Sequence, residues 1–173
     1  MILDYDQIDP LLLDALEGFP PLDITRDNIL AVRKMLYARP APPKPDGIIE
    51  NLETIETDSG EVKVYVYRKN KRPNQPAVIW IHGGGYIFGS AEDHRAMRIA
   101  KEIDCTVFSI DYRLAPEHPF PAGPEDCYAS IKWLMTEQSG YDINLHRVAL
   151  GGASAGGGPS VRKFSLPPKK ILQ

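Results

Sequence analysis

The sequence predicts an α/β fold with a mostly parallel sheet and flanking helices, and three features support this prediction. Three short runs are almost entirely apolar: 77–81, 106–110 and 148–150. Runs of this kind are typical of strands that are buried on both faces of a parallel sheet. Segments with helical periodicity lie between the runs, and alternation of strand and helix favours parallel strands joined by right-handed crossovers.

Two short amphipathic helices are expected before this core. The first follows Asp9 and Pro10, a capping carboxylate and a proline at the first helical position, and ends near Gly18. The second begins at Thr25 and carries apolar residues at helical spacing: Ile29, Val32 and Leu36. The proline-rich run at 39–45 has no capacity to form a core and marks a boundary. We therefore expect a helical cap and connector over 1–45 and an α/β core over 46–158.

The first strand of the core is expected at 61–67, where polar and apolar residues alternate. A helix should follow Ser90–Asp93, which resembles a capping box, with one apolar stripe: Ala96, Ile99, Ala100 and Ile103. A second helix is expected from Glu125 to Gln138, with an apolar face and Gly140 as its terminator: Cys127, Ile131, Leu134 and Met135. The run at 148–150 is then the last strand.

The composition excludes several classes of function. The chain has 173 residues, a hydrophobic content of 43% and a net charge of -3, so nothing in it favours nucleic acid or an anionic membrane as partner. Four histidines and two cysteines are too scattered for a metal site, and Cys105 and Cys127 are expected to be buried free thiols. No signal segment or membrane span is apparent, which makes the cytoplasm the default location.

The segment Gly152-Ala153-Ser154-Ala155-Gly156 is the most informative part of the chain. It follows a predicted strand and matches Gly-x-Ser-x-Gly, the sharp turn that exposes a nucleophilic serine at the end of a strand. A serine hydroxyl is a poor nucleophile at neutral pH, so it needs a histidine to accept its proton and a carboxylate to orient that histidine. Ser154 is therefore the candidate nucleophile. Without a second motif to support it, a serine at such a position would more often be a helix cap.

A second motif, His82-Gly83-Gly84-Gly85, follows directly on the strand at 77–81. Consecutive glycines let the backbone turn tightly and leave N–H groups uncovered by side chains. Such donors can bind the negative oxygen that develops when an ester carbonyl is attacked. A glycine triplet would also fit a plain loop or a phosphate cradle. The pairing with the serine motif is what favours an oxyanion hole.

Together these motifs resemble the hormone-sensitive-lipase-like branch of the α/β-hydrolases, and so does the run 111–122, DYRLAPEHPFPA. The resemblance implies an esterase or lipase that acts on short to medium acyl esters without a metal or other cofactor. It implies Ser154 as nucleophile and an oxyanion hole formed by the N–H groups of Gly83, Gly84 and Ala155. His82, Gly85, Gly152 and Gly156 would support the motifs, and the N-terminal helices resemble the family's cap.

The sequence departs from the family in two respects. Ala153 stands where the family often has Asp, a mild change because a small residue still fits the turn. In addition, none of the 19 residues after Ser154 is Asp, Glu or His, although the fold places both partners after the serine. The four histidines, His82, His94, His118 and His146, are all expected to have structural or surface roles. We therefore expect no triad acid or triad histidine in this chain.

Residues 159–173 interrupt the α/β pattern. Pro159 would fall within the helix expected after the serine turn, and four basic residues occur without any acidic one. Our hypothesis is an aberrant basic tail of foreign or out-of-frame coding, the alternative being a solvated tail. The last strands of the family's sheet would then be missing.

Three functions remain open at this point. The chain is an ester hydrolase by resemblance, acting on a small-molecule ester, but is expected to be inactive alone. Alternatively it is a non-catalytic module that binds an acyl ligand or a protein. A third reading is one half of a split hydrolase, completed by a C-terminal fragment. We also expect an exposed apolar terminal strand to make the chain prone to aggregation.

Overall fold

The structure is a computed structural model that describes residues 8–17, 24–38, 43–58, 60–136 and 140–158. The chain forms two compact units, Met1–Pro40 and Ala41–Gln173. The hypothesis about the tail at 159–173 lies outside the described residues, as do the helix terminator Gly18 and the start of the proline-rich connector.

The first unit contains the two expected helices, α1 (Pro10–Glu17) and α2 (Ile29–Tyr37). Asp9 caps α1 by accepting a hydrogen bond from the Leu11 N–H at 2.9 Å. Helix α2 begins four residues after the predicted start. Thr25 and Asn28 exchange side-chain to backbone hydrogen bonds in both directions, and this pairing holds 25–28 in a turn.

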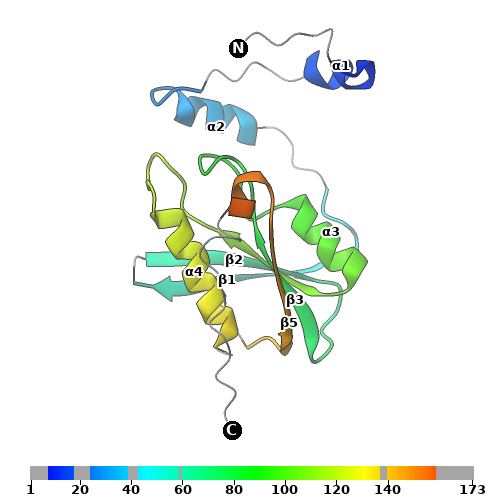
Figure 1. Cartoon of the computed structure of the whole chain (residues 1–173). Helices are drawn as coiled ribbons and strands as arrows, with labels where there is room; N and C mark the ends of the chain where they lie inside the picture. The colour runs from blue at the N-terminus through cyan, green and yellow to red at the C-terminus, as the bar shows by residue number, and fades with distance from the viewer. Residues whose placement is uncertain (1–7, 18–23, 39–42, 59, 137–139, 159–173) are drawn as a thin grey trace. The chain divides into compact units, whose positions relative to one another are not determined.

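The second unit is built on a five-stranded sheet with the order β1-β2-β4-β3-β5 (Figure 1). The strands are β1 (Ile49–Thr57), β2 (Gly60–Arg68), β3 (Gln75–Ile81), β4 (Thr106–Asp111) and β5 (Ile143–Gly152). Strand β3 lies parallel to β4 and to β5, whereas β1 pairs antiparallel with β2 and β2 antiparallel with β4. The predicted α/β fold is confirmed. The sheet is mixed because its first two strands, β1 and β2, form an antiparallel hairpin.

Strand β1 has no counterpart in the sequence prediction. Its apolar residues are spaced by three, at Ile49, Leu52 and Ile55, which hides the period of two that identifies a strand. Burial in the structure does alternate, because Asn51 and Glu53 are partly buried while Leu52 is exposed. The antiparallel pairing with β2 therefore sets the conformation of β1 against its own hydropathy pattern.

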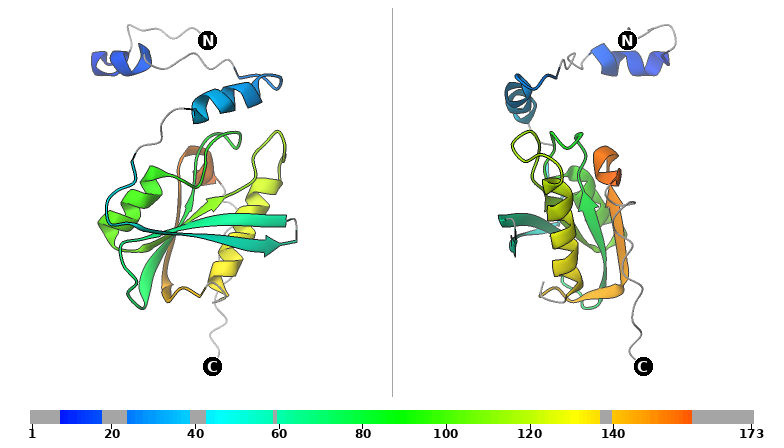
Figure 2. Two further views of the ribbon diagram at one scale, coloured as in Figure 1. Left: turned by 180° about the vertical axis from the view of Figure 1, so that it is seen from behind. Right: turned by 60° about the vertical axis from the view of Figure 1, so that its left-hand side comes forward.

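The two helices of this unit cover opposite faces of the sheet (Figure 2). Helix α4 (Ala122–Met135) packs on one core cluster that includes Ala77, Ile79 and Ile81 of β3. Helix α3 (His94–Ile103) packs on a second cluster, to which Val78 and Trp80 of the same strand belong. Successive strand residues point to opposite faces, so β3 contributes to both cores.

Helix α3 follows Ser90–Asp93 as expected but with another capping residue, and helix α4 begins earlier than the sequence predicts. Asp93, not Ser90, caps α3, and its carboxylate accepts the Arg95 N–H at 2.9 Å. Ile103 is 65% exposed, and Met97 takes its expected place in the buried stripe. Helix α4 starts at Ala122, three residues before the expected Glu125, and its last described turn ends at Met135.

Strand β5 does not match the expectation of a strand buried on both faces. Val148 and Leu150 are partly buried and Ala149 is exposed, whereas β4 is buried almost throughout. The reason is its position: within the described residues β5 pairs only with β3 and forms the edge of the sheet. Cys105 and Cys127 are buried free thiols, as predicted.

Among the described residues there is neither a membrane-spanning helix nor a cluster of metal ligands. No helix there has the length and apolarity needed to cross a membrane. Likewise, no group of three or more His, Cys, Asp or Glu side chains in the described ranges is arranged to hold a metal ion.

Candidate active site

Ser154 lies at a sharp turn between β5 and a short 3-10 helix, Ser154–Gly156. Its φ is +49°, in the left-handed region that residues other than glycine rarely adopt. Ala153 before it is extended, and Gly157 after it is helical. This strand, strained serine and helix form the geometry expected of a nucleophile elbow, and the serine is exposed.

The two flanking glycines are needed because the backbone closes tightly around the turn. A Cβ atom on Gly152 would lie 2.4 Å from the carbonyl oxygen of Gly156. A Cβ on Gly156 would lie 2.2 Å from the carbonyl oxygen of Ile81, at the end of β3. A side chain at Gly152 would force the turn itself open, and one at Gly156 would push the elbow away from β3.

The loop after β3 lies against this elbow. A Cβ on Gly83 would come within 2.8 Å of the Ala153 carbonyl oxygen and 3.4 Å of the Ser154 Cβ. Gly84 and Gly85 have positive φ values of +114° and +63°. The backbone N–H of Ala153 donates to the Ile81 carbonyl at 3.1 Å, which fixes the elbow to the start of the loop.

The loop and the elbow contain the three backbone N–H groups that the resemblance indicates as oxyanion donors, those of Gly83, Gly84 and Ala155. In the part of the chain that the structure describes, none of them donates a hydrogen bond to another residue. The carbonyl oxygen of Gly84, by contrast, accepts from Ile87 and Phe88. Free donors of this kind, beside a serine, can stabilise a developing oxyanion.

His82 anchors the base of the loop. It is 1% exposed, its ring stacks on Tyr112 at 4.2 Å, and Nδ1 lies 2.8 Å from the Gly83 carbonyl oxygen. Because a carbonyl only accepts, Nδ1 carries the hydrogen of this bond. Gly89 lies close to the same edge of the ring, because a Cβ at this position would lie 2.2 Å from Nδ1. Burial lowers the pKa of His82, so the imidazole is neutral near pH 7.

Two carboxylates brace the loops near this site. Asp111, at the end of β4, accepts the Ala91 N–H at 3.3 Å and so holds the segment before α3. Asp126, from helix α4, holds the loop after β4. Its side chain is 1% exposed and pairs with Arg113 at 2.7 Å, and this hydrogen bond raises the pKa of the Arg113 guanidinium.

The remaining histidines lie elsewhere. His94 is the first residue of α3, and His118 is exposed in the loop before α4. His146 precedes Ser154 by eight residues along β5, which corresponds to roughly 25 Å of extended strand. Within the described residues, the Ser154 hydroxyl makes no hydrogen bond to a histidine or a carboxylate.

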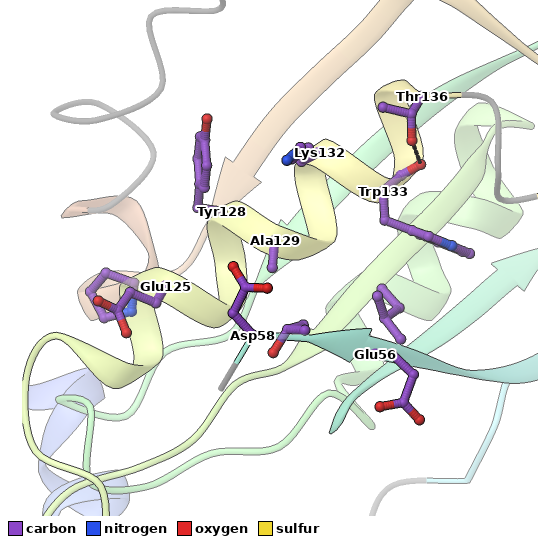
Figure 3. A pocket seen from close by; sticks show the side chains of 11 residues that line it. Glu56, Asp58, Glu125, Tyr128, Ala129, Lys132, Trp133 and Thr136 are labelled. Atoms are coloured by element: carbon purple, nitrogen blue, oxygen red, sulfur yellow. Dashed lines mark hydrogen bonds between the residues drawn. The ribbon is translucent and has the colours of Figure 1, made fainter. Parts of the chain in front are cut away.

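A groove of about 820 Å³ lies on another part of the molecule, between the end of β1 and helix α4 (Figure 3). Asp58 from the hairpin and Glu125, Tyr128 and Lys132 from the helix line it. None of its lining residues belongs to the glycine loop or the elbow. The candidate site is therefore the exposed junction around Ser154, and the groove is separate from it.

A comparison with protein-family models matches residues 78–161 to the alpha/beta hydrolase fold. The match covers both motifs, the whole of β5 and part of β3. The chain has the α/β-hydrolase fold. This agrees with the resemblance to the hormone-sensitive-lipase-like branch that the motifs indicated.

Relatives of this α/β-hydrolase chain include known esterases. Esterase LipI from Mycobacterium tuberculosis is 36% identical over 156 residues, which are 87% of this chain and 48% of that protein. An arylesterase from Saccharolobus solfataricus is 33% identical over 141 residues, 79% of this chain and 46% of the relative. The chain thus spans about half the length of the relatives that it matches.

Solved structures give the same result. Esterase LipW from Mycobacterium marinum superposes with a TM-score of 0.75 at 30% identity, over 90% of this chain and 51% of that one. A bacterial heroin esterase has a TM-score of 0.73 at 31% identity, over 90% and 51% of the two chains. The α/β-hydrolase core described above is therefore shared with these esterases.

One residue of the site was not identified from the sequence. Tyr86 follows the three glycines, and its hydroxyl donates to the Ala155 carbonyl at 2.8 Å. An aromatic residue after a glycine loop does not by itself indicate a contact with a residue 69 positions later.

Proposed function

We propose that this chain forms the nucleophile-bearing part of a serine carboxylic-ester hydrolase that acts on short to medium acyl esters. Ser154 Oγ would attack the ester carbonyl carbon to give a tetrahedral intermediate, which would expel the alcohol with a proton and leave an acyl-enzyme. Water would then hydrolyse the acyl-enzyme to the free acid and restore the serine hydroxyl. The N–H groups of Gly83, Gly84 and Ala155 would bind the oxyanion. No metal or organic cofactor enters this chemistry.

One observation carries the proposal: a strained, exposed serine lies beside three N–H groups without a hydrogen-bond acceptor. Strain at a non-glycine residue typically costs about 1–3 kcal/mol and is retained where function needs the geometry. The relatives of this chain include carboxylic-ester hydrolases, which supports the same reaction class.

We further propose that the 173 residues alone hydrolyse esters very slowly. Within the described residues Ser154 makes no hydrogen bond to a histidine that could accept its proton, and the buried His82 is committed to the Gly83 carbonyl. Donors and binding without a triad give about 10³–10⁴-fold acceleration over water, far below an active esterase.

The exposed edge of β5 favours a second candidate, a hydrolase completed by a separate fragment. Strand β5 presents partly buried Val148 and Leu150 at the edge of the described sheet, and such an edge can pair with another strand. The fragment would supply further strands with the acid and the histidine.

The experiment measures hydrolysis of p-nitrophenyl butyrate by the chain alone and after mixing with the C-terminal half of an esterase relative. Little turnover alone and a strong increase on mixing, lost in Ser154→Ala, supports the proposal. Acyl-ligand protection against unfolding with no turnover in either arm would favour a non-catalytic binding module instead.

A further inference from the structure

The three N–H groups of the proposed oxyanion hole belong to two separate segments. Gly83 and Gly84 lie in the loop after β3, whereas Ala155 follows the elbow at the end of β5. Donors stabilise an oxyanion only where they converge on the same oxygen position. The separation of the two segments therefore decides whether the donors act together.

Two backbone contacts join the segments on the strand side of Ser154. Gly83 packs closely against the Ala153 carbonyl, and the Ala153 N–H donates to Ile81 at 3.1 Å. Both contacts precede the nucleophile in the chain, and neither reaches Ala155. On the other side of Ser154, Gly156 packs against the Ile81 carbonyl. None of these contacts is made by Ala155 itself.

The Tyr86 side chain contacts Ala155 directly. Its hydroxyl donates to the carbonyl oxygen of Ala155 at 2.8 Å, and Tyr86 itself lies only two residues after Gly84. The backbone of Tyr86 has φ +64°, a left-handed conformation that is sparsely populated by residues with a side chain. Its carbonyl accepts the Ala115 N–H at 3.0 Å, so the residue is held from the loop after β4 as well.

The Tyr86 hydroxyl bonds to a carbonyl of the short helix Ser154–Gly156. The Gly157 N–H of the same segment points to the Ala155 and Ser154 carbonyls. The Tyr86 hydroxyl therefore adds a donor from a different segment, which joins Ala155 to the glycine loop.

We propose that Tyr86 is a positioning residue that holds Ala155 against the glycine loop, so that the three N–H groups point at one oxygen. The role rests on the proposed function, because it presupposes an oxyanion hole at Ser154. Tyr86 acts through Ala155 and does not itself take part in the bond changes.

The test compares the 173-residue chain with Tyr86→Phe, which removes the hydroxyl and keeps the ring. Both are treated with diisopropyl fluorophosphate at alkaline pH. The Oγ–P bond forms on Ser154, the P–F bond breaks, fluoride leaves and the hydroxyl proton goes to solvent. The P=O oxygen of the adduct then occupies the oxyanion position, and its phosphorus NMR resonance reports the hydrogen bonds to it.

A matched control removes a tyrosine hydroxyl at the opposite end of β5. Tyr141 donates to Glu53 there, so Tyr141→Phe also deletes a hydroxyl that bonds to another segment, without touching the elbow. A general loss of stability would affect both variants. A change in the resonance of the folded adduct would be specific to the donors around Ser154.

We expect Tyr86→Phe to move the phosphorus resonance of the folded adduct toward that of the urea-unfolded adduct. The labelling rate should fall about tenfold, less than the 10²–10³-fold cost of removing a donor outright. Tyr141→Phe should leave both quantities unchanged.

Two other results would be decisive. A Tyr86→Phe adduct with the wild-type resonance and rate overturns the positioning role and leaves the proposed function intact. A wild-type adduct with the same resonance folded and unfolded, or no label on Ser154, overturns the oxyanion hole and the role of Tyr86 with it.

Discussion

The carboxylate of Asp126 binds both the backbone and the side chain of Arg113. The carboxylate accepts the Arg113 N–H at 2.8 Å and the guanidinium at 2.7 Å. This joins helix α4 to the loop after β4. The same loop donates from Ala115 to the carbonyl of Tyr86, beside the candidate oxyanion hole. The ion pair is thus connected to the proposed site through the loop after β4 and Tyr86.

Asp126→Asn should lower the free energy of unfolding by about 3 kcal/mol, because it leaves the partly buried guanidinium without its counter-charge. Urea denaturation followed by circular dichroism measures the change. The neighbouring Glu125 is exposed, so Glu125→Gln serves as the control and should have little effect. Equal effects of the two variants would show that the pair does not brace the loop.

Gly156→Ala should destabilise the chain by more than about 3 kcal/mol, since the added Cβ would meet the Ile81 backbone at 2.2 Å. Gly157→Ala is the matched control. Its nearest neighbour would be 3.8 Å away and its φ of -69° is helical, so alanine should be neutral or stabilise by up to about 1 kcal/mol. Thermal unfolding of both variants tests this, and similar losses would contradict the tight elbow.

Stability should decrease as the pH falls through about 6.5, because of His82. Burial lowers the pKa of His82 from its ordinary 6.5, so the unfolded chain binds the proton first. Stability from the neutral ring is complete above 6.5 and is lost progressively below it. Unfolding midpoints from pH 8 to pH 5 measure the slope. His82→Gln should flatten it, whereas replacing the exposed His118 should not.

The two cysteines should be unreactive in the folded chain. Burial raises the pKa of the Cys127 thiol to about 12 and also raises that of Cys105, so little thiolate forms at mildly alkaline pH. A thiol-specific disulfide reagent should titrate neither cysteine until denaturant is added, and then both. Rapid reaction of one thiol per folded chain would contradict their burial.

The edge of β5 should make the chain self-associate at high concentration. Ala149 is the exposed residue of its apolar run, so Ala149→Lys places a charge on that edge with little cost to the core. Light scattering should show fewer oligomers for this variant than for wild type. A wild-type chain that stays monomeric, with a cooperative thermal transition, would count against an exposed edge.

Much of the fold could be predicted because local sequence and tertiary environment agree. Strands β3 and β4 are apolar runs that are buried in the sheet, and the elbow glycines of β5 have no room for a side chain. Strand β1 could not be predicted, since its apolar residues recur every three positions and its pairing with β2 determines its conformation.

The sequence did not indicate the role of Tyr86 in the site or of Asp126 behind it, for the same reason. Asp126 and Tyr86 act through contacts with segments distant in sequence, and neither hydropathy nor spacing encodes such contacts. Asp126 has the sequence context of an ordinary acidic residue in the first turn of a helix, which hides its burial. The motif residues were identifiable because their chemistry depends on neighbours in sequence.

The pH dependence of Ser154 modification by diisopropyl fluorophosphate tests the central claim most directly. The claim is that Ser154 is an elbow nucleophile beside free N–H donors, with no base in this chain. If only hydroxide removes its proton, the labelling rate should rise about tenfold per pH unit through neutrality without a plateau. A rate that levels off with an apparent pKa near 7 would reveal a histidine base and contradict the account.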